Sequence, residues 1–260
     1  LKVHAKLAYI RKRSNDPDEP IKGYAYLGTG NFNEKTARIY SDKGLLTSNR
    51  DIIVEIDEVF NILEGKGQSK VFQHLLVAQF NMIPEINAMI DREINHVQNG
   101  GKGRIVIKLN SLEDKSMINS LYRASEAGVE IDLIIRGICC LIPNQEFSKN
   151  IRITRIVDSY LEHSRIWYFY NMGEENLYLT SADWMSRNLH RRIEVAFPIF
   201  DAQIKREIID ILKIQLADNV SAVWVDEYLN NVFKRDGLTD DVNLVRSQRD
   251  TYEYLRGIKQ

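Results

Sequence analysis

The sequence predicts an α/β fold in which mixed sheets are flanked by helices, arranged as one partial and one complete domain. In the middle of the chain, two apolar and β-branched runs, Arg104–Leu109 and Val129–Arg136, enclose a segment of helical spacing, Leu112–Ala127. A crossover of this length is typical of parallel strands. In addition, one short polar pattern, a histidine followed two residues later by a cation, occurs twice and far apart in the chain. This repetition indicates two related units.

The other elements follow from the same periodicities. Alternating or β-branched apolar residues predict strands at Lys2–Arg11, Lys22–Leu27, 151–157, 164–170, Asn176–Thr180 and Ile193–Pro198. Apolar residues on one helical face predict helices at Asp51–Leu63, Pro84–Val97 and Ile204–Leu216. Asn33 or its neighbour can cap a short helix through Arg38. The final forty residues are polar and are expected to be helical or irregular, without recognisable chemistry.

The glycine-containing segment Gly65–Lys70 is the best candidate for a domain boundary. Residues 1–70 are then the C-terminal part of a first domain, and residues 71–260 form a second, complete domain. The chain starts at Leu1 without a methionine, and His4 leaves no room for a supporting strand before it. We therefore expect a segment of a longer protein, so missing targeting signals exclude little.

Composition limits the classes of partner. The 35 Lys and Arg residues against 36 Asp and Glu residues give a net charge of −1, which argues against general electrostatic binding of nucleic acid. No apolar run approaches the length of a membrane span. Cys139 and Cys140 are adjacent, so we interpret them as small packed residues rather than a disulfide or metal ligands, which fits a reducing cytoplasm. Cations nevertheless gather near the two histidines, as expected of a channel for a polyanion.

The repeated pattern places a histidine, a cation and an asparagine at similar spacings. His4 and Lys6 precede Asn31, which lies 27 residues after the histidine; His163 and Arg165 precede Asn188 by a similar distance. Residues i and i+2 of a strand point to the same face, so each copy can direct an imidazole and a positive charge at one point. Two facing copies would hold a phosphate between two histidines, one to attack and one to manage the proton.

Other residues near each copy support or compete with this interpretation. Gly28 and Gly30 let backbone amides approach a phosphate, and Asn31 and Asn33 add amide donors; the alternative is a hairpin turn followed by a capped helix. In the second copy, Glu162 faces away from the histidine and can hold another cation. Asp183 is a candidate to orient an imidazole.

Polar residues also follow the central strands. Arg136 ends one strand, and Lys108 and Asn110 end its neighbour, where ligands gather in open α/β sheets. Tyr40 can stack on a base or simply pack. We interpret the other histidines as structural or surface residues: His74, His96 and His190.

Several classes of enzyme are excluded by the absence of their sequence motifs. There is no glycine-rich phosphate loop of the G-x-x-x-x-G-K-[ST] type, no protein-kinase catalytic loop and no H-E-x-x-H metal motif. The pair Gly28 and Gly30 lacks the third glycine of a dinucleotide fingerprint, and no Cys/His cluster has zinc spacing.

Long motifs over nearly the whole chain resemble, in family order, the polyphosphate kinases of the large, bacterial, histidine-phosphorylating type. The first contains Val3-His4-Ala5-Lys6 and the fullest of the later ones contains Leu161-Glu162-His163-Ser164-Arg165. The matching stretches are residues 3–6, 26–40, 44–47, 108–112, 128–140, 161–165, 181–185 and 187–189.

The resemblance implies reversible transfer of the terminal phosphate of ATP to polyphosphate through a phosphohistidine. His4 matches the phosphorylated histidine, and His163 matches a second essential histidine with a nucleotide-binding and proton-transfer role. Tyr40 and Arg136 match nucleotide-binding positions. With these, the candidate site has Lys6 and Arg165 as further catalytic residues, and the candidate phosphate or polyphosphate ligands are Asn31, Asn33, Lys108, Asn110 and Asn188.

The same resemblance implies a phospholipase D-like arrangement of paired half-sites, and Mg²⁺ as cofactor with ligands upstream of this chain. We expect ATP, ADP and inorganic polyphosphate as partners, no nucleic acid, a homo-oligomeric parent protein and a cytoplasmic location, with attachment to the membrane periphery as the alternative. Metal ligands within the chain are not expected.

The chain departs from these patterns at a few positions. Arg165 stands where the phospholipase D-like pattern has lysine, and no aspartate follows Lys6 at that spacing, both of which favour the kinase. The loop 144–147 is poor in glycine, and His190 stands where an acidic residue is expected. The alternatives are a phospholipase D-like phosphodiesterase and a non-catalytic module that binds polyphosphate or nucleotide.

Overall fold

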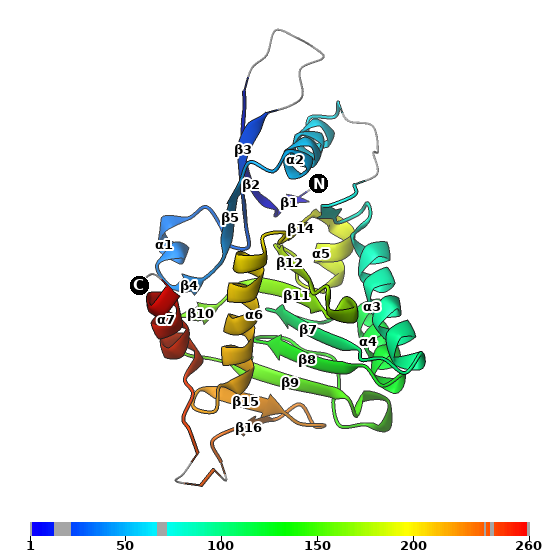
Figure 1. The fold of residues 1–260 in the computed structure, drawn as a ribbon, viewed down its shortest axis with the longest axis vertical. Helices are drawn as coiled ribbons and strands as arrows, with labels where there is room; N and C mark the ends of the chain where they lie inside the picture. The colour runs from blue at the N-terminus through cyan, green and yellow to red at the C-terminus, as the bar shows by residue number, and fades with distance from the viewer. Residues whose placement is uncertain (1, 13–21, 67–71, 237, 240–241, 259–260) are drawn as a thin grey trace.

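The computed structural model describes residues 2–12, 22–66, 72–236, 238–239 and 242–258 (Figure 1). The predicted boundary Gly65–Lys70 therefore lies largely outside the described residues. The helices are α1 Glu34–Ala37, α2 Arg50–Leu63, α3 Met82–Gln98, α4 Lys115–Glu126, α5 Ser186–Arg191, α6 Ala202–Ala217 and α7 Ser247–Ile258. The strands are β1 Lys2–Val3, β2 Lys6–Arg11, β3 Gly23–Gly28, β4 Tyr40–Ser41, β5 Gly44–Thr47, β6 Leu76–Val77, β7 Arg104–Leu109, β8 Glu130–Ile135, β9 Ile151–Ile156, β10 Leu161–Glu162, β11 Arg165–Phe169, β12 Asn176–Thr180, β13 Arg192–Ile193, β14 Val195–Pro198, β15 Ala222–Val225 and β16 Asn231–Phe233.

Within the described residues, a nine-stranded mixed sheet has the order β16-β15-β9-β8-β7-β11-β12-β14-β6. Strands β7, β8 and β9 are parallel, which confirms the predicted parallel crossover, and their neighbours β11 and β15 are antiparallel to them. Helices cover the sheet, so the predicted α/β class with mixed sheets flanked by helices is confirmed (Figure 1).

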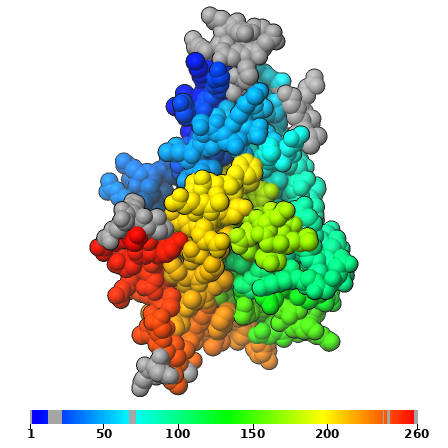
Figure 2. All heavy atoms as spheres, in the orientation of Figure 1, coloured from blue at the N-terminus to red at the C-terminus, as the bar shows by residue number. Residues whose placement is uncertain are grey.

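The two faces of the sheet have separate apolar cores because side chains alternate along each strand. Ile105, Ile107 and Leu109 of β7 pack in a core with apolar residues of α3 and α4. Val106, on the opposite face of β7, packs in a second core with α6, α2 and strand β3. Helix α6 lies across the middle of the molecule in the view of Figure 2. Residues at even positions of β7 therefore lie on the α6 face.

The N-terminal unit contains the three-stranded antiparallel sheet β2-β3-β5, against which α2 packs. Two short parallel pairings join it to the large unit: β1 with β13, and β4 with β10. These pairings bring segments far apart in sequence into contact, and both end beside a predicted site histidine. That residues 1–70 and 71–260 are two separate domains stays a proposal.

Most predicted bounds shift by one or two residues, and the predicted strand Ile193–Pro198 is divided into β13 and β14. Two further differences have a visible cause in the hydrogen bonds. The predicted strand Lys2–Arg11 is interrupted, because the amides of His4 and Ala5 both donate to the carbonyl of Ile193. Helix α4 begins at Lys115 rather than at Leu112, because the Asp114 side chain caps its first turn. In the described residues, no helix is both long and apolar enough to cross a membrane.

Candidate functional site

His4 lies directly after β1 and is oriented by a buried carboxylate. Its Nδ1 is 2.8 Å from Oε2 of Glu194, a residue that follows β13 and is fully buried. Ser181 Oγ donates to Glu194 Oε2 over 2.5 Å, and Asn188 Nδ2 donates to Glu194 Oε1 over 2.6 Å. Because an ionised carboxylate only accepts hydrogen bonds, Nδ1 of His4 carries the proton in this arrangement. The lone pair of the neutral ring is then on Nε2.

His163 lies directly after β10 and has the same kind of partner. Its Nδ1 is 2.8 Å from both carboxylate oxygens of Asp42, and Thr29 Oγ1 donates to Asp42 over 2.7 Å. A Cβ at Gly30 would overlap the Asp42 carboxylate, so this glycine makes room for the pair. The Arg165 guanidinium lies 3.4 Å from Nε2 of His163.

Burial and neighbouring charges tune this second pair. Burial, together with the positive charge of Arg165, lowers the pKa of His163 despite the opposing effect of Asp42. Burial alone would raise the pKa of Asp42, but the hydrogen bonds from His163 and Thr29 outweigh it and lower this pKa. At neutral pH the pair is therefore a neutral imidazole that donates to a carboxylate.

The two pairs are reciprocal across the two units. His4 in the N-terminal unit is held by Glu194 of the large unit, and His163 in the large unit is held by Asp42 of the N-terminal unit. The predicted half-motifs thus form one site, with each histidine oriented by the opposite copy. Neither Glu194 nor Asp42 was predicted from the sequence. The repeat is a weak signal for them, because an acidic residue follows each asparagine turn, at Asp42 and at Glu194, but Glu34 also follows the first turn.

Lys6 places a buried positive charge at this site. Its side chain is 5% exposed, and no described residue accepts a hydrogen bond from its Nζ. The pKa of Lys6 is lowered to about 8, chiefly by burial and also by the nearby Arg165, against the opposing effects of Glu194, Asp42 and Asp183. The ammonium therefore lies within electrostatic reach of the carboxylates of both pairs.

Arg165 is fixed by Asp183, which corrects the predicted role of that aspartate. Arg165 Nη2 donates to Asp183 Oδ2 over 3.0 Å, and Asp183 Oδ1 accepts the backbone amides of Asn110 and Ser111. In the described residues Asp183 accepts no hydrogen bond from an imidazole. Asp183 orients Arg165 instead. Burial alone would raise the pKa of Asp183, but the positive charge and the hydrogen bond of Arg165 outweigh burial and lower this pKa.

Arg136 and Tyr40 lie at the same site. Arg136 Nε donates to the carbonyl of Glu162 over 2.7 Å, and Asn110 Oδ1 accepts from Arg136 Nη2 over 2.8 Å. The Tyr40 ring lies 4.7 Å from the His163 ring, centroid to centroid. Asn110 therefore holds Arg136, and both Arg136 and Tyr40 border His163.

Three predicted phosphate ligands lie elsewhere or serve other contacts. Asn31 is exposed, and Asn33 is the exposed cap of α1, where its side-chain oxygen accepts the amides of Lys35 and Thr36. Asn188 is buried and its amide group donates to Glu194. The alternative interpretation of this turn, a capped helix, is the one that the structure shows for Asn33.

Lys108 does not reach the site surface, which corrects its assignment as a polyphosphate ligand. It lies on the α6 face of β7, its side chain is 2% exposed, and its ammonium is used by Glu162 and Ser164. The inference that Glu162 faces away from His163 and holds another cation is confirmed, and that cation is Lys108.

The described residues do not form a magnesium site. No group of three or more His, Cys, Asp and Glu side chains among them could hold a metal ion. The site carboxylates are already engaged: Glu194 and Asp42 by the histidines, and Asp183 by Arg165. Hard cations such as Mg²⁺ need several free oxygen ligands.

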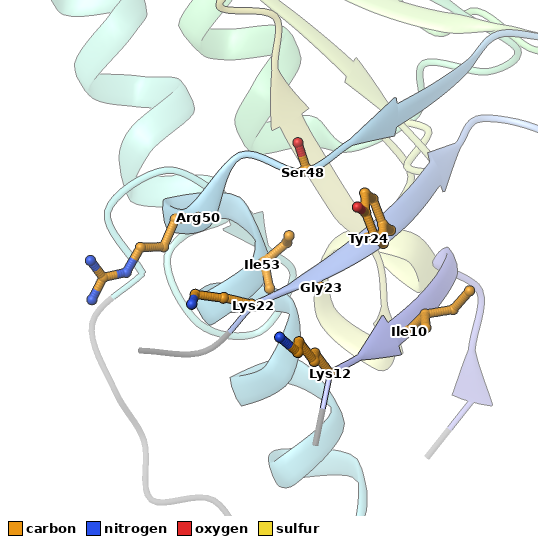
Figure 3. Close-up of a pocket in the computed structure, with 8 residues that line it drawn as sticks. All are labelled: Ile10, Lys12, Lys22, Gly23, Tyr24, Ser48, Arg50 and Ile53. Carbon is orange, nitrogen blue, oxygen red and sulfur yellow. The ribbon is translucent and has the colours of Figure 1, made fainter. Parts of the chain in front are cut away.

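A cavity of about 730 Å³ lies at the far end of the small sheet, between its strands and the start of α2 (Figure 3). It is lined by Ile10, Lys12, Lys22, Gly23, Tyr24, Ser48, Arg50 and Ile53. None of the residues of the two histidine pairs lines it, so we assign it no part in the site.

The chain matches two models of one family. The model "Polyphosphate kinase C-terminal domain 1" matches residues 1–69, and "Polyphosphate kinase C-terminal domain 2" matches residues 75–248. A polyphosphate kinase of Klebsiella pneumoniae is 44% identical over 261 residues, covering 100% of this chain and 37% of that protein. One of Synechocystis is 50% identical over 223 residues, covering 85% of this chain and 30% of that protein.

A solved structure agrees with these sequence matches. The crystal structure of polyphosphate kinase from Porphyromonas gingivalis superposes with a TM-score of 0.95 at 52% identity, covering 99% of this chain and 39% of that one. The chain thus spans about a third of the length of the curated relatives it matches. Because the larger family model alone covers 174 of the 260 residues, the chain belongs to the polyphosphate kinase family.

Proposed function

We propose that this chain carries the phosphoryl-transfer site of a polyphosphate kinase, which moves the terminal phosphate of ATP reversibly onto polyphosphate through a phosphohistidine at His4. The observation that carries the proposal is the Nδ1 hydrogen bond from His4 to the buried Glu194, beside the Lys6 ammonium, for which no described residue is a hydrogen-bond acceptor. This bond leaves Nε2 of His4 as the nucleophilic nitrogen.

The first step is attack by Nε2 of His4 on the γ-phosphorus of ATP. A P–N bond forms, the bond to the bridging oxygen breaks, and its electron pair leaves on the β-phosphate of ADP. The imidazole gains positive charge as it attacks, and the Nδ1–H bond to Glu194 stabilises that charge. In the second step, a terminal oxygen of polyphosphate takes the phosphoryl group from His4, and the reverse sequence makes ATP.

The remaining site residues supply positioning and charge. Lys6, Arg136 and Arg165 stabilise the negative charge on the transferring group, which is the main demand of phosphoryl transfer. Tyr40 and His163 bind the nucleotide, and neutral His163 has the lone pair to accept or return a proton.

Glu194→Gln should slow phosphorylation of His4 by roughly 10²- to 10⁴-fold, because a neutral amide no longer stabilises the imidazolium or fixes its tautomer. Rapid-quench measurement of the phosphorylation rate checks this. Asp201→Asn is the matched control, since this residue only caps α6 and asparagine caps equally well. A wild-type rate in the Glu194 variant would contradict the assigned role.

The protein should become less stable as the pH falls, because His163 binds a proton more readily in the unfolded chain than in the folded one. Its pKa is lowered by burial, so the unfolded chain takes up a proton near pH 6.5 and the folded chain only at lower pH. The free energy of unfolding therefore decreases as the pH drops through that window. Urea unfolding between about pH 5 and pH 7.5 should show a smaller loss for His163→Asn than for wild type. Equal losses would count against the lowered pKa.

The test of the proposed function is labelling of the full-length protein with γ-labelled ATP and Mg²⁺, followed by peptide mapping. Acid-labile, base-stable label on the His4 peptide supports the kinase. Hydrolysis of a phosphodiester without label would favour the phospholipase D-like alternative, which the paired histidines also fit. Label on the full-length protein but not on residues 1–260 alone would make this chain a catalytic half that needs the remaining domains of the protein. The use of Mg²⁺, the cytoplasmic location and the homo-oligomeric state stay predictions from the resemblance.

A further inference from the structure

A buried carboxylate lies directly before His163 and is shared by several elements. The Glu162 side chain is 3% exposed, so its charge must be satisfied inside the protein. Its donors come from β4, β7, α6 and α7: Ser41 Oγ at 3.3 Å, Lys108 Nζ at 2.8 Å, Gln215 Nε2 at 3.0 Å and Gln248 Nε2 at 2.9 Å.

Lys108 ties together the residues on both sides of His163. Its ammonium donates to Glu162 Oε2, and also to Oγ of Ser164 at 2.8 Å and to the Ser164 carbonyl at 3.2 Å. The two neighbours of His163 in the chain, Glu162 and Ser164, thus bind the same buried cation, which restrains the backbone of His163.

The same cluster holds the partner of the imidazole. Ser41 precedes Asp42, and the Ser41 carbonyl accepts the amides of His163 and Ser164 at 3.2 and 2.9 Å. Ser41 Oγ donates to Glu162. The hydrogen bonds around Glu162 and Ser41 therefore position both His163 and Asp42.

The C-terminal helix takes part through its first turn. Gln248 accepts from the amide of Tyr160 at 2.9 Å, donates to the Tyr160 carbonyl at 2.7 Å, and donates to Glu162. Next to it, Arg246 pairs with Asp158. The final forty residues, whose sequence shows no recognisable chemistry, thus contact the carboxylate next to His163.

A buried ion pair is an inefficient way to gain stability. Removing two charges from water costs several kcal/mol per ion, and well-packed apolar residues of similar volume are often as stable or more so. A purely structural junction at this place would not need Lys108 and Glu162. The need to hold the backbone beside His163 in one position is a reason for this junction to contain the two charged residues.

We propose that Lys108 and Glu162 are a positioning pair that fixes His163 and Asp42 for nucleotide binding and phosphoryl transfer, with Gln248 linking α7 to the pair. The inference rests on the proposed function for its catalytic readout. Neither residue touches the transferring group, so the pair acts through the backbone on either side of His163.

The experiment compares four variants of the full-length protein. Lys108→Met/Glu162→Leu replaces the pair by apolar residues, Glu162→Gln leaves the cation unbalanced, and Gln248→Ala removes one peripheral link. Asp132→Asn is the control, because Asp132 is a second buried carboxylate of the same sheet, held by Arg104 and Arg152. Each is measured for melting temperature, dissociation constant of ATP, and rate of His4 labelling.

The double variant should fold with a lowered melting temperature, because Ser41, Gln215 and Gln248 lose their acceptor, and it should bind ATP and label His4 about 10- to 100-fold more weakly. Gln248→Ala should fold and show a smaller defect of the same kind, whereas Asp132→Asn should lose stability only. A double variant with wild-type labelling and ATP affinity overturns the proposal. If it does not fold, wild-type values for Gln248→Ala overturn it. If the wild-type protein takes up no label, the proposed kinase function is refuted instead. The dissociation constants of ATP then still decide whether Lys108 and Glu162 position His163.

Discussion

His4→Ala in the full-length protein should abolish acid-labile labelling by ATP and all polyphosphate synthesis. The variant lacks the Nε2 lone pair that the Glu194 hydrogen bond prepares, and the described site offers no second imidazole with an equivalent opening, since His163 Nε2 faces Arg165. The residual rate should be that of uncatalysed transfer. This residual rate is measured by labelling the variant at an enzyme concentration that saturates the signal of the wild-type protein.

Two other histidines serve as controls for this variant. His190→Ala should label like wild type, because this side chain is 49% exposed and contacts only Asp114 among the described carboxylates. His163→Ala should label weakly, with all label still on the His4 peptide. Strong label on the His163 peptide in the His4 variant would reverse the assigned roles of the two histidines.

The parts of the site that depend on local spacing could be predicted from the sequence. A strand of alternating faces was enough to pair His163 with Arg165 and to turn Glu162 away from them. Apolar periodicity and glycine ends gave the parallel β7–α4–β8 unit, and Asn33 could be recognised as a helix cap. Each of these inferences concerns residues close together in the chain.

The orienting carboxylates depend on contacts that no local pattern contains. Glu194 meets His4 across 190 residues, and Asp42 meets His163 across 121. Both are placed by strands of only two residues, β13 and β4, which are too short to show a period. Lys108 was predicted to be a phosphate ligand because it lies near the end of a strand, but the packing of α6 over that face buries it. The link from Gln248 to the site depends on the docking of α7, which is equally non-local.

Lys6→Met should make the protein more stable and nearly inactive. The Lys6 ammonium is buried without a hydrogen-bond acceptor in the described residues, and its pKa is lowered from 10.5 to about 8, chiefly by burial. The folded state thus disfavours the charged form, which at pH 7 costs about 3 kcal/mol relative to the unfolded chain. Methionine fills a similar volume without the charge, so we expect it to recover about 2 kcal/mol of that cost.

The pH dependence separates this explanation from a general packing effect. Between about pH 8 and pH 10.5 the unfolded chain keeps its Lys6 proton while the folded chain loses it. The free energy of unfolding of the wild type therefore rises relative to that of the variant as the pH rises. Urea unfolding at pH 7 and about pH 9.5 should therefore show a large, then a smaller, advantage for Lys6→Met. Lys149→Met, at an exposed position, should show neither change.

The same variant should label His4 roughly 10²- to 10³-fold more slowly, because Lys6 is the buried cation closest in sequence to the nucleophile and phosphoryl transfer depends on charge stabilisation. A cation kept at a cost in stability is expected where the substrate is an anion, since a bound phosphate group would place negative charge beside the Lys6 ammonium. If Lys6→Met is no more stable than wild type, or transfers phosphate at the wild-type rate, the positive charge of Lys6 is not reserved for the substrate.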